Sequence, residues 1–168
     1  MKALITYYSR TGHTAQVAET LERELLAKGV SVEMLRLHRE REASLLGCWT
    51  EARRGAKPAL NELPKDVSGY DLVFLGFPNW VSRASSPANS MVAGIQNVSG
   101  KKCILFPTSG FKNGFASGLN YIESSVKSAG GDVIASQGFT EGERNKIGER
   151  AADLVARVLG LAQADSSL

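Results

Sequence analysis

The sequence predicts an α/β protein in which helices cover both faces of a five-stranded parallel sheet, forming a three-layer, doubly wound sandwich. Two observations support this fold class. Short runs rich in Val, Ile, Leu and Phe alternate along the chain with longer segments of helical period. Three of these runs are almost continuously apolar, as expected for parallel strands that are buried on both faces. The 168 residues, 43% of them hydrophobic, match the size of one domain.

The short apolar runs are expected to form the five strands. They are Lys2–Tyr8, Val30–Leu37, Asp71–Phe77, Lys102–Thr108 and Asp132–Phe139. Because each is followed by a segment of helical period, the connections between neighbouring strands are expected to be right-handed crossovers.

The helices are predicted from their amphipathic pattern. In the first, which begins at His13, apolar residues such as Val17, Leu21 and Leu25 form one stripe, and Gly29 marks its end. The other helices are expected at about Ser86–Val98, Ala116–Ala129 and Glu143–Leu161. Residues 1–162 are therefore predicted to form a single domain, and residues 163–168 a flexible tail.

The least regular segment is residues 38–69, which replaces the expected second helix. A short helix is predicted at about Ser44–Arg53, followed by a turn at Gly55–Pro58. Its charges alternate in sign, which favours a solvated connection.

Composition excludes several classes of function. The 20 basic and 17 acidic residues are interspersed and give a net charge of only +3, which does not favour nucleic-acid binding. No apolar stretch approaches the roughly 20 residues of a membrane span, and the apolar start "ALITYY" is too short for a signal peptide. We therefore expect a cytoplasmic protein without membrane insertion. Cys48 and Cys103 are expected to be free thiols, with no ligand cluster for a metal.

A doubly wound sheet binds its ligand beyond the carboxyl ends of its strands, near the point where strand order reverses. The segments at that edge are the loops "SRTGHT", "PNWVSRASSP" and "TSGFKNGFAS", which follow the first, third and fourth strands. Each loop ends close to the start of a helix, where unpaired N–H groups favour an anion.

The first loop has the chemistry of a phosphate site. The hydroxyl groups of Ser9, Thr11 and Thr14 can donate hydrogen bonds, Gly12 allows a close backbone approach, and no carboxylate is present to repel a dianion. The P-loop pattern G-x-x-x-x-G-K-[ST] and the dinucleotide pattern G-x-G-x-x-G are both absent, so a single phosphate is favoured. The alternative is that Ser9 and Thr14 only cap the helix.

Three segments together resemble the flavodoxin family. They are "ALITYYSRTGHTAQVAETL", "SGYDLVFLGFPNWVSRASSP" and "KKCILFPTSG", and their order and spacing agree over about residues 1–160. The resemblance implies a flavodoxin-like fold with FMN as its cofactor. The fifth strand continues without an inserted loop into the last helix, which resembles the short-chain branch of the family.

The resemblance also implies roles for the three loops. The FMN phosphate would be held by Ser9, Arg10, Thr11, Gly12, His13 and Thr14. One face of the isoalloxazine ring would meet Pro78, Asn79, Trp80, Val81 and Ser82. The opposite wall would be Thr108, Ser109, Gly110 and Phe111.

Several of these residues have competing interpretations. Trp80 is expected to stack on the ring, and otherwise to pack in the core. Phe111 either lines the site or anchors the following helix. Asn79 is the candidate for the peptide that flips beside the flavin N5, because Asn tolerates a positive φ. Cys48 either approaches the flavin or makes a plain apolar contact.

The three loops carry positive charges but no negative ones. Residues 9–14, 77–90 and 107–118 contain no Asp or Glu, but they contain Arg10, His13, Arg83 and Lys112. If these four surround the flavin, they would raise its reduction potential and favour anionic partners. The alternative is that such side chains only solvate loop tips.

Three functions follow as hypotheses. The first is an FMN electron-transfer protein that serves a redox partner protein, with an acidic docking surface on that partner. The second is an NAD(P)H-dependent FMN or quinone oxidoreductase, although the T-R-[FY]-G string of the best-known quinone reductases is absent. The third is a flavodoxin-like interaction domain without FMN. In the first two the flavin carries the chemistry, and no catalytic side chain is predicted.

Overall fold

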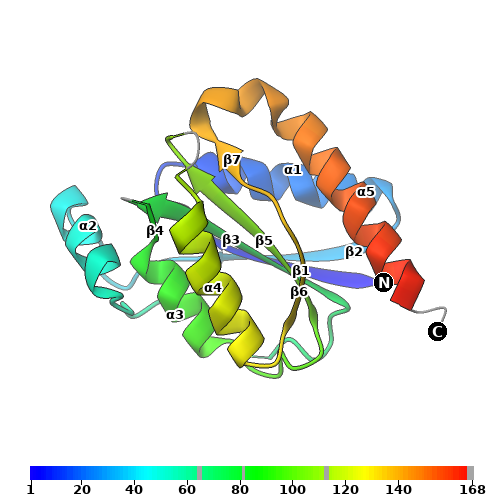
Figure 1. The fold of residues 1–168 in the computed structure, drawn as a ribbon, viewed down its shortest axis with the longest axis horizontal. Coiled ribbons are helices and arrows are strands. Elements are labelled where there is room, and N and C mark those ends of the chain that lie inside the picture. The colour runs from blue at the N-terminus through cyan, green and yellow to red at the C-terminus, as the bar shows by residue number, and fades with distance from the viewer. Residues whose placement is uncertain (64–65, 81, 112–113, 166–168) are drawn as a thin grey trace.

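The computed structural model describes residues 1–63, 66–80, 82–111 and 114–165. Its main sheet has five parallel strands in the order β2-β1-β3-β5-β6, which confirms the predicted fold class (Figure 1). The strands are β1 (Lys2–Tyr8), β2 (Ser31–Leu37), β3 (Leu72–Trp80), β5 (Lys102–Ser109) and β6 (Asp132–Ser136). Because β2 and β3 lie on opposite sides of β1, strand order reverses at β1 and β3, and a ligand is expected there.

The helices form two layers, one on each face of the sheet (Figure 1). Helices α1 (His13–Ala27) and α5 (Ile147–Asp165) pack together on one face, and α3 (Ser86–Gly94) and α4 (Ala116–Ser128) on the other. Helix α2 (Leu45–Arg54) lies at the side, near the carboxyl ends of the strands.

Each strand contributes to two cores because successive side chains point to opposite faces. Ile5 and Phe74 are fully buried beneath α1 and α5, whereas their neighbours Leu4 and Val73 are buried beneath α3 and α4. This double burial explains why the strands read as continuous apolar runs. None of the described helices is both long and apolar enough to cross a membrane.

Three short elements at the carboxyl edge were not predicted as separate elements: the strand predicted at Asp132–Phe139 breaks after Ser136, and the helix predicted from Glu143 begins as a 3-10 helix. The strand β4 (Arg83–Ala84) pairs antiparallel with β3, and β7 (Phe139–Thr140) pairs with β5. A 3-10 helix, η1 (Glu141–Lys146), precedes α5. Two-residue strands have no periodic pattern, so sequence analysis cannot detect them.

The connection between β2 and β3 is more structured than predicted. Its helix is confirmed: the Ser44 side chain accepts a hydrogen bond from the Gly47 N–H at 3.1 Å and caps α2, which ends at Gly55 with a left-handed φ of 64°. The expectation of a merely solvated segment is wrong. Arg39 and Cys48 are buried, and Arg39 forms an ion pair with Glu51.

Candidate cofactor site

The loops after β1, β3 and β5 meet in a cleft of about 170 Å³ at the carboxyl edge of the sheet. The cleft is lined by Arg10, Thr11, His13, Thr14, Pro78, Asn79, Trp80, Thr108, Ser109, Gly110 and Glu141. All of these except Glu141 belong to the predicted site. Of the other predicted residues, Ser9, Gly12, Ser82 and Phe111 do not line the cleft, and Val81 lies outside the described residues.

The loop after β1 is shaped by Gly12 and Ser9. Gly12 has a left-handed φ of 91°, which a glycine adopts without strain, and α1 begins at the next residue. The Ser9 Oγ accepts hydrogen bonds from the N–H groups of Gly12 and Ala15, each at 3.2 Å. Ser9 therefore caps the helix, as the alternative interpretation expected.

Capping by Ser9 leaves several backbone N–H groups near the start of α1 available to a ligand. Within the described part of the chain, the backbone N–H groups of Thr11, His13 and Thr14 have no hydrogen-bond partner. These groups lie at the positive end of the α1 dipole, where an anion is stabilised. The first turn of α1 thus offers the donors that a phosphate group requires.

A pair of threonines joins two of the loops. The hydroxyl groups of Thr14 and Thr108 are 2.8 Å apart, and both residues are buried. Thr14 therefore bridges to β5 and does not cap α1. Because one hydroxyl donates in this pair, the hydrogen of the other remains available for a ligand.

His13 is buried in the first turn of α1, with 5% of its surface exposed. Burial lowers the pKa of its imidazole, and the positive charge of Arg144 lowers it further. The Phe139 carbonyl and Glu141 act on the pKa in the opposite direction, although neither ring nitrogen has a hydrogen bond of regular geometry. His13 is therefore neutral at neutral pH and does not supply the positive charge that was expected of it.

Glu141 lines the cleft but was missed by sequence analysis. It begins η1, directly after β7, and its carboxylate pairs with the Arg144 guanidinium at 2.7 Å. The expectation of a site without carboxylates considered only three loops. The sequence could nevertheless have indicated Glu141, because this residue follows the fifth predicted strand, whose carboxyl end reaches the same edge of the sheet.

The hairpin of β3 and β4 forms one side of the cleft. Trp80 is partly exposed, and its indole meets the Tyr8 ring edge-on, with centroids 6.1 Å apart. Asn79 lies within β3, paired with Ala84, and the positive φ of this region is at Ser82, at 61°. Asn79 does not have a positive φ in this conformation, and its part in a peptide flip beside the flavin N5 stays a prediction.

The side chain of Asn79 has a different role. Its Nδ2 donates hydrogen bonds to the carbonyl groups of Gly114, at 2.8 Å, and Phe115, at 3.1 Å. These bonds tie β3 to the segment that begins α4. Phe111 is 82% exposed, so it neither lines the cleft nor anchors that helix.

Of the four basic residues expected around the flavin, Arg10 and His13 line the cleft. The Arg10 side chain lines the cleft, but its guanidinium donates to the Ala43 carbonyl and to the Cys48 Sγ. Arg83 lines a different hollow, and Lys112 lies outside the described residues. Cys48 is thus a buried acceptor that anchors Arg10, rather than a plain apolar contact or a flavin neighbour.

The comparison with known proteins supplies the family. A family model described as flavodoxin matches residues 48–146, which is more than half of the chain. The chain belongs to the flavodoxin family. No curated protein matches it.

Solved structures of flavodoxins share the fold at low sequence identity. The flavodoxin 2 of Bacillus cereus superposes with a TM-score of 0.66 at 16% identity, covering 95% of this chain and 99% of that one. A candidate flavoprotein of Bacteroides uniformis gives a TM-score of 0.66 at 22% identity, with 88% and 96% covered. The two-electron-reduced flavodoxin of Megasphaera elsdenii gives 0.59 at 22%, with 90% and 98% covered.

Membership of the flavodoxin family implies FMN as the cofactor, and the cleft fits its phosphate. The match to the family model begins after the loop of β1, so this loop is assigned by its geometry alone. It offers unpaired N–H groups, a free hydroxyl hydrogen and a neutral imidazole in buried surroundings. The cleft, of about 170 Å³, is smaller than the range of about 300–1,000 Å³ that is usual for small-molecule sites, so it would hold only part of the cofactor.

FMN binding should place a proton on His13 in mildly acidic solution. The pKa of the free imidazole is lowered by burial, and a phosphate dianion beside it would raise that pKa. Below the ordinary histidine pKa of about 6.5, binding should therefore take up as much as one proton at His13. Calorimetric titration in two buffers of different ionisation enthalpy measures this uptake. The difference between wild type and His13→Gln isolates the imidazole, and equal proton counts in the two would contradict the prediction.

The contact between α4 and the hairpin should be sensitive to one methyl group. A Cβ added at Gly118 would lie 2.5 Å from the Asn79 Oδ1 and 2.6 Å from the backbone N of Ala84. We expect Gly118→Ala to lower the free energy of unfolding by about 1–3 kcal/mol, because hairpin and helix must separate. Urea denaturation measures this change. Gly160→Ala, in a helix with open space around the new methyl, should instead be neutral or stabilising.

Proposed function

We propose that the protein is an FMN-dependent electron carrier that binds the FMN phosphate at the start of α1. One observation carries the proposal: the unpaired N–H groups of α1 open into the same cleft that Trp80 and the loop after β5 line. Hydrogen-bond donors for a phosphate and a flat aromatic side chain thus lie at the same edge of the sheet, as a phosphorylated flavin requires.

The residues of the chain bind and orient the cofactor. The first turn of α1 and the hydroxyl pair of Thr14 and Thr108 hold the phosphate, and Trp80 offers a surface for the ring. The ion pair of Glu141 and Arg144 adds no net charge beside the cleft. When bound, the flavin itself supplies one-electron and two-electron chemistry.

The proposal includes a redox partner protein with an acidic docking surface. The net charge of +3 supports it, since opposite charges favour encounter between two proteins. Direct exchange with NAD(P)H is the competing function, and it would need access for a nicotinamide ring to the flavin.

Anaerobic reduction of the purified protein separates the hypotheses. We expect flavin absorbance that dithionite bleaches rapidly, whereas NADPH alone reduces the flavin slowly or not at all. Rapid bleaching by NADPH, with turnover on a quinone or free flavin, would favour the oxidoreductase. Protein that is colourless and does not bind added FMN would favour the interaction domain.

A further inference from the structure

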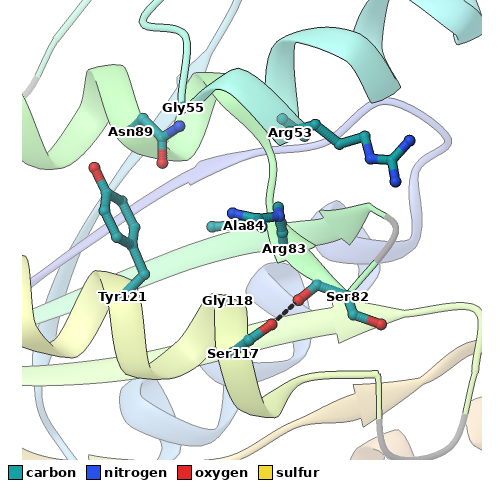
Figure 2. A pocket seen from close by; sticks show the side chains of 10 residues that line it. Arg53, Gly55, Ser82, Arg83, Ala84, Asn89, Ser117, Gly118 and Tyr121 are labelled. Carbon is teal, nitrogen blue, oxygen red and sulfur yellow. Dashed lines mark hydrogen bonds between the residues drawn. The ribbon is translucent and has the colours of Figure 1, made fainter.

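A second hollow, of about 450 Å³, lies behind the hairpin of β3 and β4 (Figure 2). It is open to solvent and is bordered by the end of α2, by β4, and by residues of α3 and α4. It is lined by Ala52, Arg53, Gly55, Ser82, Arg83, Ala84, Asn89, Ser117, Gly118 and Tyr121. None of these residues lines the cofactor cleft, so the hairpin separates two distinct spaces.

Asn89 provides an unsatisfied acceptor in this hollow. It is 2% exposed, and its Nδ2 donates to the Ala56 carbonyl at 3.1 Å, which fixes the orientation of the amide. Its Oδ1 is buried without a hydrogen-bond partner, a state that costs about 1–3 kcal/mol. Figure 2 shows this oxygen turned toward the space beside the Tyr121 ring. A ligand with an N–H or O–H donor would satisfy it.

The charged lining of the hollow is entirely positive. Arg53 and Arg83 are exposed, and neither side chain makes a hydrogen bond or ion pair within the described part of the chain. They come from opposite walls, Arg53 from the last turn of α2 and Arg83 from β4. Because long arginine side chains can turn toward a bound anion and bind phosphate oxygens bidentately, the mouth of the hollow suits a phosphate group.

We propose that this hollow binds a nucleoside monophosphate whose base carries an amino group. The phosphate would bind Arg53 and Arg83, the base would lie against Tyr121, and the amino group would donate to the Asn89 Oδ1. The volume falls within the range of about 300–1,000 Å³ that is usual for small-molecule sites.

The position of the hollow indicates a regulatory ligand rather than a second electron donor. The hollow and the cofactor cleft share no lining residue: Pro78, Asn79 and Trp80 of the hairpin line the cleft, whereas Arg83 and Ala84 line the hollow. The same hairpin pairs Arg83 with Trp80, and Ser117 donates a hydrogen bond to the Ser82 carbonyl. A ligand bound to Arg83 would therefore affect the position of β3, the strand that contains Trp80.

Calorimetric titration with AMP tests the proposal, and excess FMN keeps AMP out of the cofactor cleft. Wild type should bind AMP, and Arg53→Glu/Arg83→Glu should raise the dissociation constant at least about tenfold through repulsion of the phosphate. Arg54→Glu is the matched control, because Arg54 neighbours Arg53 but does not line the hollow. Circular dichroism and FMN affinity should be unchanged in both variants.

Two smaller probes and a further variant identify the parts of the ligand. Adenosine and inorganic phosphate should each bind at least about tenfold more weakly than AMP, since each lacks one set of contacts. Tyr121→Ala, at an exposed position, should weaken AMP but not phosphate. No binding of AMP at millimolar concentration, equal affinity for inorganic phosphate, or an equal loss in Arg54→Glu would overturn the proposal.

Discussion

Thr11→Glu is expected to weaken FMN binding about 100-fold or more, because like charges placed side by side cost several kcal/mol. Thr11 is exposed, lines the cleft and precedes α1 by two residues. The new carboxylate would stand beside the phosphate dianion. It would also interact favourably with the α1 dipole, so the fold itself should not be weakened. Fluorescence titration of the apoprotein with FMN measures the change.

The control for this variant is Ser124→Glu, which places the same charge on the exposed face of α4. It should leave the FMN dissociation constant unchanged. High salt should restore part of the lost affinity in Thr11→Glu, since exposed charges are screened. Equal FMN affinity in the two variants would show that the phosphate does not bind at the start of α1.

Glu51→Ala should lower the free energy of unfolding by about 3 kcal/mol, because it leaves a buried guanidinium without its counter-charge. Both terminal nitrogens of Arg39 donate to the Glu51 carboxylate at 2.9 Å, and the Arg39 side chain is only 4% exposed. Glu51 is 29% exposed, so we place the loss at the lower end of the range for buried pairs. Urea denaturation provides the measurement.

The loss should depend on pH in a defined direction. Hydrogen bonds from Arg39 hold the pKa of Glu51 below its usual value. A carboxyl group whose pKa is lower in the folded state stabilises the fold above its ordinary pKa of about 4.3. This stabilisation is lost as the pH falls through the lower folded value, so wild type and Glu51→Ala should converge in acid.

Two further variants distinguish the ion pair from a general effect of charge. Glu62→Ala removes an exposed carboxylate and should change stability by less than about 0.5 kcal/mol. Arg39→Met/Glu51→Met should recover part of the loss, because apolar replacement of a buried pair is often tolerated. If Glu51→Ala proves as stable as Glu62→Ala, the pair does not hold α2 in place.

Sequence patterns predicted the sheet well because burial on both faces leaves a strong signal. The run from Leu72 to Phe77 has no polar side chain, since alternate side chains enter two different cores. The loop that we propose binds the FMN phosphate was equally visible, because hydroxyl groups and Gly12 stand between a strand and a helix without a carboxylate. Both signals are local in sequence.

Features that depend on distant contacts were not predictable. The direction of the Arg10 side chain is set by Ala43 and Cys48, which lie more than thirty residues along the chain. Glu141 reaches the cleft only because β7 pairs with the end of β5. The hollow behind the hairpin likewise requires three separate segments, and no single stretch of sequence encodes it.

The relative affinity of the apoprotein for FMN and riboflavin tests the central claim most directly. The two ligands share the isoalloxazine ring and differ only in the phosphate, so their ratio measures what the first turn of α1 contributes. Phosphate hydrogen bonds to several N–H groups at a helix start should make FMN bind at least about 100-fold more tightly. Equal affinity for FMN and riboflavin would contradict the account.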